Sequence, residues 1–277
     1  MEQVKIRIRL EVAYDGTEFS GWAVQPQRRT VAGVLTEALD RAFGPATATG
    51  LTVAGRTDAG VHATGQVCHV DVPEAVWSDR AGTLLRRLAG TLPRDVRVRA
   101  VIEVPGEFDA RFSATYRRYA YRVTDAPYGA DPLRRHDTLA WPRPLDLAAL
   151  STAAAQFVGE HDFAAYCRRK EHATTIRHIT RLDWQRDSDG VLIGTVQADA
   201  FCQAMVRSLV GAMLFAGDGR RPADWPASLL TRRERSGEVT VAPPHGLTLV
   251  EVGYPADPHE YATRALVTRR LRLPAVP

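Results

Sequence analysis

The feature that most constrains this chain is a polar, glycine-rich stretch, residues 54–67, that lies between two apolar segments. It contains three glycines, an imidazole, the cation Arg56 and the carboxylate of Asp58. The apolar run 51–53 before it and the alternating run 67–72 after it predict strands. We therefore expect Asp58 on a connection between two strands, although Asp-Ala-Gly by itself is also typical of an ordinary turn.

Length and composition limit the class of protein. The 277 residues suffice for one large or two medium domains, and 45% apolar with 25% charged residues is typical of a soluble globular protein. No apolar run approaches the roughly 20 residues that span a bilayer, and the first residues lack the apolar core of a signal peptide. We therefore expect a cytoplasmic protein without a membrane segment.

Charge and cysteine content say less about function. The net charge of +4 permits a polyanionic partner without requiring one. The three cysteines, Cys68, Cys167 and Cys202, are far apart and odd in number, and none forms a Cys-x-x-Cys pair. They predict neither a disulfide framework nor a structural zinc site.

The first half of the chain has the order β-α-β-β-α-β. Alternating apolar residues over 4–12 predict a strand, and residues 31–42 follow helical spacing after Thr30, a good N-cap residue. The two strands beside Asp58 come next. A second helix is expected over about 79–89, and a strand over 96–104.

The second half repeats this order without obvious sequence identity. Patterns predict strands at 115–123, 176–186, 191–198 and 248–254, and helices at 146–157 and about 202–216. A proline-rich connection covers 125–144, and residues 187–190 are typical of a hairpin turn. This plain turn is the counterpart of the elaborate Asp58 loop, and the contrast suggests that the loop has a task beyond joining strands.

Each half matches the split βαβ arrangement. We expect an α+β fold in which two ferredoxin-like halves join into one extended antiparallel sheet, with helices on one face and the active-site cleft on the other. The N-terminal half, 1–110, would carry the Asp58 loop, and the C-terminal half would cover 111–255. Residues 256–277 form a tail to which we assign no function.

Several chemistries can be weighed for the loop. A metal site would use Asp58 and His62 with His69, but the spacing lacks the local pattern that recurs in zinc sites. A phosphate cradle would need glycines that open a helix, and a serine triad would need a Gly-x-Ser-x-Gly elbow. What remains is a carboxylate with Arg56 two residues before it, which an enzyme can use as a nucleophile.

These residues carry a resemblance. Residues 55–63 with 65–67, Gly-Arg-Thr-Asp-Ala-Gly-Val-His-Ala with Gly-Gln-Val, resemble the signature of the tRNA pseudouridine synthase A, or TruA, family. Further matching segments follow in order at 14–16, 19, 21–22, 108–114, 118–119, 159–163, 200–201, 205–207, 211 and 246–247. The resemblance spans about residues 5–255.

The resemblance implies a homodimeric isomerase without metal or cofactor that converts uridine to pseudouridine at positions 38, 39 and 40 of the tRNA anticodon stem-loop. It makes Asp58 the catalytic nucleophile. The bond between uracil N1 and ribose C1′ is broken, the base is turned, and it is rejoined through C5. Whether the carboxylate attacks C1′, attacks C6 or removes a C2′ proton on a glycal route stays open.

The resemblance also implies roles in substrate binding for four other residues. Tyr119 would stack on the target uracil, Arg207 would pair with Asp58, Arg56 would contact RNA at the extruded base, and Leu247 would pack near the base. By pattern alone Tyr119 and Leu247 are also typical core residues, and Arg207 a typical solvated helix residue. We assign no chemistry to Thr57 or His62.

RNA recognition would rest mainly on shape and phosphate contacts. Candidate contacts are Arg28, Arg29, Arg111, Arg117, Arg118, Arg168, Arg169, Lys170 and Arg177. The chain departs from the family pattern near Ala89, at Asp199 and at Gln203, which bears on local RNA contacts rather than on the nucleophile. Two other classes remain as alternatives: an inactive RNA-binding module of the same fold, and a metal-dependent hydrolase that uses Asp58 and His62.

Overall fold

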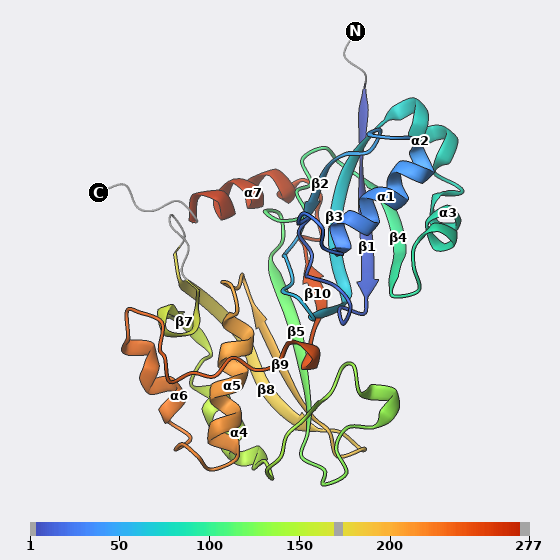
Figure 1. Ribbon diagram of the computed structural model, residues 1–277. Coiled ribbons are helices and arrows are strands. Elements are labelled where there is room, and N and C mark those ends of the chain that lie inside the picture. The colour runs from blue at the N-terminus through green and yellow to red at the C-terminus, as the bar shows by residue number, and fades with distance from the viewer. Residues whose placement is uncertain (1–3, 169–173, 272–277) are drawn as a thin grey trace. The chain divides into compact units, whose positions relative to one another are not determined.

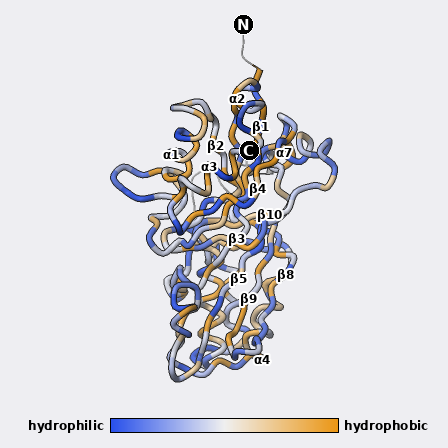
Figure 2. Tube along the Cα trace, turned by 90° about the vertical axis from the view of Figure 1, so that its right-hand side faces the viewer, coloured by the Kyte–Doolittle hydropathy of each residue, from blue (hydrophilic) through white to orange (hydrophobic). Residues whose placement is uncertain are grey.

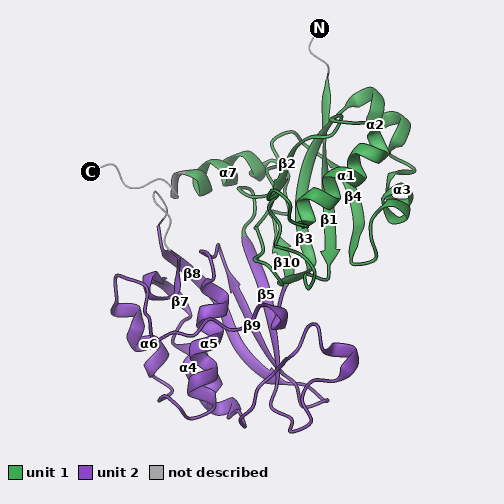
Figure 3. Ribbon diagram, in the orientation of Figure 1, with its two compact units in different colours: residues 1–115, 249–270 green, residues 116–248, 271–277 purple. Residues whose placement is uncertain are grey.

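The computed structural model describes residues 4–168 and 174–271 (Figure 1). It shows a mixed α+β protein with a large, mostly antiparallel sheet, so the expected fold class is confirmed. The chain divides into two compact units, Met1–Thr115 with Leu249–Arg270 and Tyr116–Thr248 with Leu271–Pro277 (Figure 3). Within the described ranges, no helix has the length and apolar character that crossing a membrane requires.

Unit 1 contains the first βαββαβ repeat. Its elements are β1 (Lys5–Tyr14), α1 (Val31–Phe43), β2 (Thr49–Val53), β3 (His62–Pro73), α2 (Glu74–Arg80), α3 (Leu84–Thr91), β4 (Val96–Val104), most of β10 (Leu247–Gly253) and α7 (Glu260–Leu271). The strands pair in the order β4-β1-β3, and both β2 and β10 pair with β3. This is the strand arrangement expected of a split βαβ unit.

Local sequence explains the main elements of unit 1. Ile8, Leu10 and Val12 alternate along β1 and are fully buried. Helix α1 begins after Thr30, whose Oγ1 accepts a hydrogen bond from the Gly33 N–H. Figure 2 colours the chain by hydropathy and shows hydrophobic and hydrophilic stretches interspersed along the Cα trace. The sequence signals and the observed elements therefore agree for β1 and α1.

One helix of unit 1 was predicted wrongly. Instead of a single helix over 79–89, the structure has α2 at Glu74–Arg80 and α3 at Leu84–Thr91. Residues 81–83 between them form a turn, and they include Gly82, a poor residue for a helix interior. The apolar face that the pattern detected is that of α3, where Leu84 and Leu88 are fully buried.

Unit 2 contains the second repeat with short additions. Its elements are β5 (Tyr116–Thr124), β6 (Leu139–Ala140), α4 (Leu147–Ala155), β7 (Gly159–Asp162), β8 (Ile176–Arg186), β9 (Leu192–Ala198), α5 (Met205–Gly217) and α6 (Trp225–Ser228). The strands pair in the order β5-β9-β8-β7, and β6 adds a short parallel pairing to β5. The predicted hairpin turn between β8 and β9 is confirmed, with Gly190 at φ +81°.

The end of the chain differs from the expected tail. Residues 249–270 belong to unit 1, whereas the sequence pattern assigned residues up to 255 to the second half. The backbones of β10 and β3 come so close that a Cβ on Gly65 would lie 2.2 Å from the Val250 carbonyl oxygen. Beyond β10, the chain forms helix α7 and buries Tyr261.

The cysteine interpretation also needs correction. Cys167 and Cys202 are paired as a disulfide within unit 2, with their Cα atoms 5.7 Å apart. The two residues are separated by 35 positions, and only the fold brings η2 (Ala164–Tyr166) beside the segment that leads into α5. Cys68 is buried and unpaired in β3, and burial raises the pKa of its thiol.

Candidate active site

Asp58 lies in a tight turn between β2 and β3, as the flanking patterns predicted. Its carbonyl oxygen accepts a hydrogen bond from the Val61 N–H at 3.2 Å, and Gly60 adopts φ +76°. The Asp58 side chain is half-buried, whereas Thr57 before it and Val61 after it are buried. The loop is therefore a turn in which the half-buried side chain of Asp58 lies between the buried residues Thr57 and Val61.

The segment after β1 holds this turn from the side. The Trp22 N–H donates to the Thr57 carbonyl at 3.1 Å, and the Gly60 N–H donates to the Phe19 carbonyl at 3.2 Å. Gly21 has φ +92°, and a Cβ at this position would lie 2.8 Å from the Thr57 carbonyl oxygen. These contacts hold the backbone on both sides of Asp58 and explain the glycine before Trp22.

The Nδ1 atom of His62 makes structural contacts with the turn that follows β1. Its Nδ1 accepts a hydrogen bond from the Gly16 N–H at 2.9 Å and lies 3.1 Å from Asp15 Oδ1. A Cβ on Gly16 would lie 2.1 Å from the Val61 carbonyl oxygen, so the two segments meet at backbone distance. His62 thus joins the 15–16 turn to the start of β3.

His69 makes a similar contact further along β3. Its Nδ1 accepts from the Ala110 N–H at 3.0 Å. Burial, helped by the positive charge of Arg7, lowers the pKa of His69 to about 4. The two histidines that a metal site would need therefore bind separate backbone groups. In the part of the chain that the structure describes, no cluster of three His, Cys, Asp or Glu side chains could hold a metal ion.

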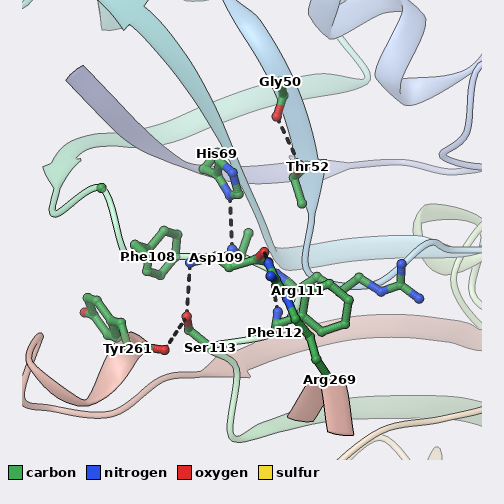
Figure 4. A network of polar contacts seen from close by, with 12 residues as sticks. Gly50, Thr52, His69, Phe108, Asp109, Arg111, Phe112, Ser113, Tyr261 and Arg269 are labelled. Atoms are coloured by element: carbon green, nitrogen blue, oxygen red, sulfur yellow. Dashed lines mark hydrogen bonds and ion pairs between the residues drawn. The ribbon is translucent and has the colours of Figure 1, made fainter. Parts of the chain in front are cut away.

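The segment 108–113 is built around Asp109 (Figure 4). Its Oδ1 accepts from the backbone N–H groups of Arg111 and Phe112 at 2.8 and 2.9 Å, and its Oδ2 accepts from Arg269 of α7 at 3.0 Å. Burial opposes ionisation, but these hydrogen bonds hold the pKa of Asp109 below its usual value. Ser113 Oγ accepts from the Asp109 N–H and donates to the Tyr261 carbonyl.

Two arginines of unit 1 lie within electrostatic reach of each other. Arg56 is exposed on the Asp58 loop, and Arg111 lies against the Phe112 ring at 5.0 Å from its centroid. Burial lowers the pKa of the Arg111 guanidinium, and the positive charge of Arg56 lowers it further. Two neighbouring cations of this kind favour an anionic ligand such as a phosphate.

The other three predicted site residues belong to unit 2. Tyr119 lies on β5 with 8% of its surface exposed, and its ring meets Phe201 edge to face at 5.3 Å. Arg207 is in the first turn of α5, where its Nε donates to the Ala242 carbonyl at 2.7 Å. Leu247 begins β10 and is buried. Asp58 and Arg56 belong to unit 1, so the expected ion pair between Asp58 and Arg207 stays a prediction.

The departures from the family pattern have local contacts. Asp199 Oδ1 accepts from the backbone N–H groups of His178 and Ala200, at 3.1 and 2.8 Å. The Gln203 carbonyl accepts from the Arg168 N–H at 3.1 Å. Ala89 is exposed on α3. The carboxylate of Asp199 therefore links strand β8 to the residues that follow β9.

Comparison with known proteins shows which family the chain resembles over these segments. A family model described as tRNA pseudouridine synthase matches residues 11–113 and 153–255. The first matched segment contains the Asp58 loop and the Asp109 segment, and the second contains Arg207 and Leu247. Tyr119 lies between the two matched segments.

Relatives cover nearly the whole chain. A tRNA pseudouridine synthase A of Frankia casuarinae is 59% identical over 272 residues, covering 98% of this chain and 97% of that protein. Proteins of the same name from Streptomyces griseus and Mycobacterium leprae are 58% and 50% identical, and the alignments cover 96% of this chain and 94% and 96% of those proteins. The chain therefore belongs to the tRNA pseudouridine synthase family, whose enzymes isomerise uridine to pseudouridine.

Proposed function

We propose that this enzyme isomerises uridine at positions 38, 39 and 40 of the tRNA anticodon stem-loop and that Asp58 is its nucleophile. The observation that supports this most is the Asp58 loop itself, which lies in the family-matched segment 11–113. It presents a half-buried carboxylate from a turn that is hydrogen-bonded on both sides. Such a fixed acid suits covalent or proton-transfer chemistry on one bound nucleotide.

The reaction rearranges the substrate without net gain or loss of atoms or electrons. The bond between N1 and C1′ breaks, a bond between C5 and C1′ forms, C5 loses its proton and N1 gains one. Asp58 could open this sequence by attack at C1′, by attack at C6 or by removal of the C2′ proton, and all three routes use an ionised carboxylate.

A target uridine inside a stem must leave the base stack before its glycosidic bond can react. Arg56 is exposed two residues before Asp58, which supports a role in the space left by the base. Arg111, which lies within electrostatic reach of Arg56, suits a phosphate of the same RNA strand. The two residues would then hold the backbone while the base enters the site.

Three residues of unit 2 complete the proposed site. Tyr119 would stack on the uracil and take part in proton removal from C5, and its edge contact with Phe201 fixes the plane of its ring. Arg207 would pair with the Asp58 carboxylate, and the bond from its Nε to the Ala242 carbonyl restricts the movement of its guanidinium. Leu247 would form an apolar wall beside the base.

Several of the cationic side chains that the sequence offered as RNA contacts are no longer candidates. Arg117 and Arg177 are only 4% and 9% exposed, so they are not surface cations that reach phosphates. Arg29 forms a two-bond pair with Asp95 at 2.7 and 2.9 Å. Arg169 and Lys170 lie outside the described residues. The remaining candidates, with Arg56 added, are Arg28, Arg111, Arg118 and Arg168.

We further propose a homodimer that acts in the cytoplasm. Family resemblance supports the dimer, and a tRNA substrate supports the compartment. Light scattering at micromolar concentration should give twice the 30.5 kDa mass of the chain. A monomer mass that persists with tRNA bound would contradict the dimer.

Position mapping tests the proposed specificity. Unmodified tRNA transcripts with uridine at positions 38, 39 and 40 would be treated with the purified protein, and pseudouridine would be mapped at nucleotide resolution. Matched transcripts with cytidine at these three positions retain every other uridine. We expect pseudouridine only in the first set and only at these positions. Modification of the matched set would show a different target.

A further inference from the structure

Three buried polar side chains form a hydrogen-bonded network that includes a residue of the Asp58 loop. Tyr14 at the end of β1 and Thr57 in the loop are 5% and 6% exposed, and Gln66 of β3 is fully buried. Tyr14 Oη lies 2.8 Å from Thr57 Oγ1, and Gln66 Nε2 lies 3.3 Å from Tyr14 Oη. Gln66 Nε2 also donates to the carbonyl oxygen of Gly55 at 2.8 Å.

The chemistry of these groups fixes one hydrogen bond of the network. The Gln66 amide nitrogen can only donate, so Tyr14 Oη accepts from it, whereas either hydroxyl can be the donor between Tyr14 Oη and Thr57 Oγ1. The Gln66 amide oxygen is occupied as well, because it accepts from the Val67 N–H at 3.2 Å. Gln66 of β3 therefore contacts the start of the loop directly, and it is connected to Thr57, the residue before Asp58, through the Tyr14 hydroxyl.

A register irregularity brings these residues together. Val12 of β1 pairs with Gln66 and Tyr14 pairs with Ala63, so β3 has one more residue than β1 between the two pairs. Such a bulge turns side chains away from strict alternation and is often found beside functional sites. Here it places the Gln66 amide next to the Tyr14 hydroxyl.

The hydroxyl and amide groups of the network are buried beside aromatic side chains. The Tyr14 ring packs with Phe19 and Trp22, at centroid distances of 6.5 and 6.1 Å. An apolar ring would fill this place equally well, and burial of hydroxyl and amide groups is favourable only when they are bonded. The polar groups are directed at the two residues that set the backbone before Asp58, Gly55 and Thr57.

We propose that Tyr14, Thr57 and Gln66 are positioning residues that fix the direction of the Asp58 carboxylate toward the reacting uridine. This inference rests on the proposed role of Asp58. The residues after Asp58 are already held by the hydrogen bonds of Gly60 and Val61. Before Asp58, the Trp22 N–H holds the Thr57 carbonyl, and the Gln66–Tyr14–Thr57 network adds a restraint on the Thr57 side chain. A misplacement of about 1 Å at a reacting group can reduce the rate about 100-fold.

Steady-state kinetics of tritium release from C5-labelled uridine in tRNA test the proposal. We expect Tyr14→Phe and Thr57→Val to lower kcat by about 10- to 100-fold, with KM for tRNA within about threefold of the parent value. Thr57→Ser keeps the hydroxyl and should retain most of kcat. The double variant Tyr14→Phe, Thr57→Val should lose little more than the worse single variant, because both changes break one network.

Tyr254→Phe is the matched control. This part-buried hydroxyl of unit 1 donates to the Ala110 carbonyl at 2.7 Å, in the Asp109 segment. It should lower the melting temperature as much as Tyr14→Phe does and leave kcat unchanged. A folded Tyr14→Phe enzyme with parental kcat, or equal activity of Thr57→Val and Thr57→Ser, would overturn the proposal. Activity of Asp58→Ala would instead refute the proposed nucleophile, so the two failures are distinguishable.

Discussion

At the scale of single residues, the backbone conformation around Asp58 depends on particular glycines. Gly16 and Gly21 let two chain segments approach to distances that exclude a Cβ, and Gly60 takes a positive φ in the turn itself. The sequence could indicate that Asp58 sits between strands, because alternating residues flank the loop. It could not indicate the contacts of Tyr14 with Thr57 and Gln66, because these depend on a bulge in the β1–β3 register.

His69 gives a residue-scale prediction about pH. Its pKa of about 4 in the folded protein lies below the ordinary histidine value, so the unfolded chain binds the proton more readily. The stabilisation from neutral His69 is complete above about pH 6.5 and is lost as the pH falls toward 4. From pH 7 to pH 5 this loss should be about 2 kcal/mol in the free energy of unfolding.

Guanidinium unfolding at pH 7 and pH 5 measures this loss. His69→Asn keeps a side-chain acceptor for the Ala110 N–H but does not titrate, so its stability should change less between the two pH values. His178→Asn replaces an exposed histidine and should keep the parental pH dependence. If His69→Asn shows the parental dependence as well, His69 is not the responsible group.

At the scale of elements, helix α7 shows where sequence patterns fail. Over residues 260–269 of the helix, where burial is described, the buried residues are Tyr261, Ala265 and Thr268, which follow helical spacing but include one large apolar side chain. The strong strands of both units were visible because Val, Ile and Leu alternate with charged residues. The α7 pattern was not visible, because a small residue, Ala265, and a polar one, Thr268, occupy buried positions in the part of the helix whose burial is described.

The contribution of α7 to unit 1 can be measured by unfolding. The Tyr261 ring packs against Phe108 at 5.2 Å, and its carbonyl accepts from Ser113 Oγ. We expect Tyr261→Ala to lower the free energy of unfolding by about 2–4 kcal/mol, because it leaves a cavity beside Phe108. Leu266→Ala on the exposed side of the same helix, where Leu266 is 57% exposed, should cost less than about 0.5 kcal/mol. Equal losses would mean that α7 does not stabilise the unit through Tyr261.

At the scale of the whole molecule, the family match runs through both units, and the proposed site draws residues from each. Asp58 and Arg56 come from unit 1, and Tyr119, Arg207 and Leu247 come from unit 2. Local sequence patterns identified the loop that carries Arg56 and Asp58, the strand that carries Tyr119 and the helix that carries Arg207, and they placed Leu247 directly before a strand. They could not indicate which partner each side chain meets, because such contacts depend on the fold rather than on neighbouring residues.

The central claim is that the carboxylate of Asp58 performs the isomerisation. The most direct measurement is tritium release from C5-labelled uridine in tRNA by the parent enzyme and by Asp58→Ala, with tRNA binding measured alongside. Asp79→Ala, which removes an exposed acid of α2, serves as the control and should have parental activity. We predict no release above background for Asp58→Ala, with tRNA affinity within about threefold of the parent because one carboxylate adds little to phosphate recognition. Sustained release by Asp58→Ala would contradict the account.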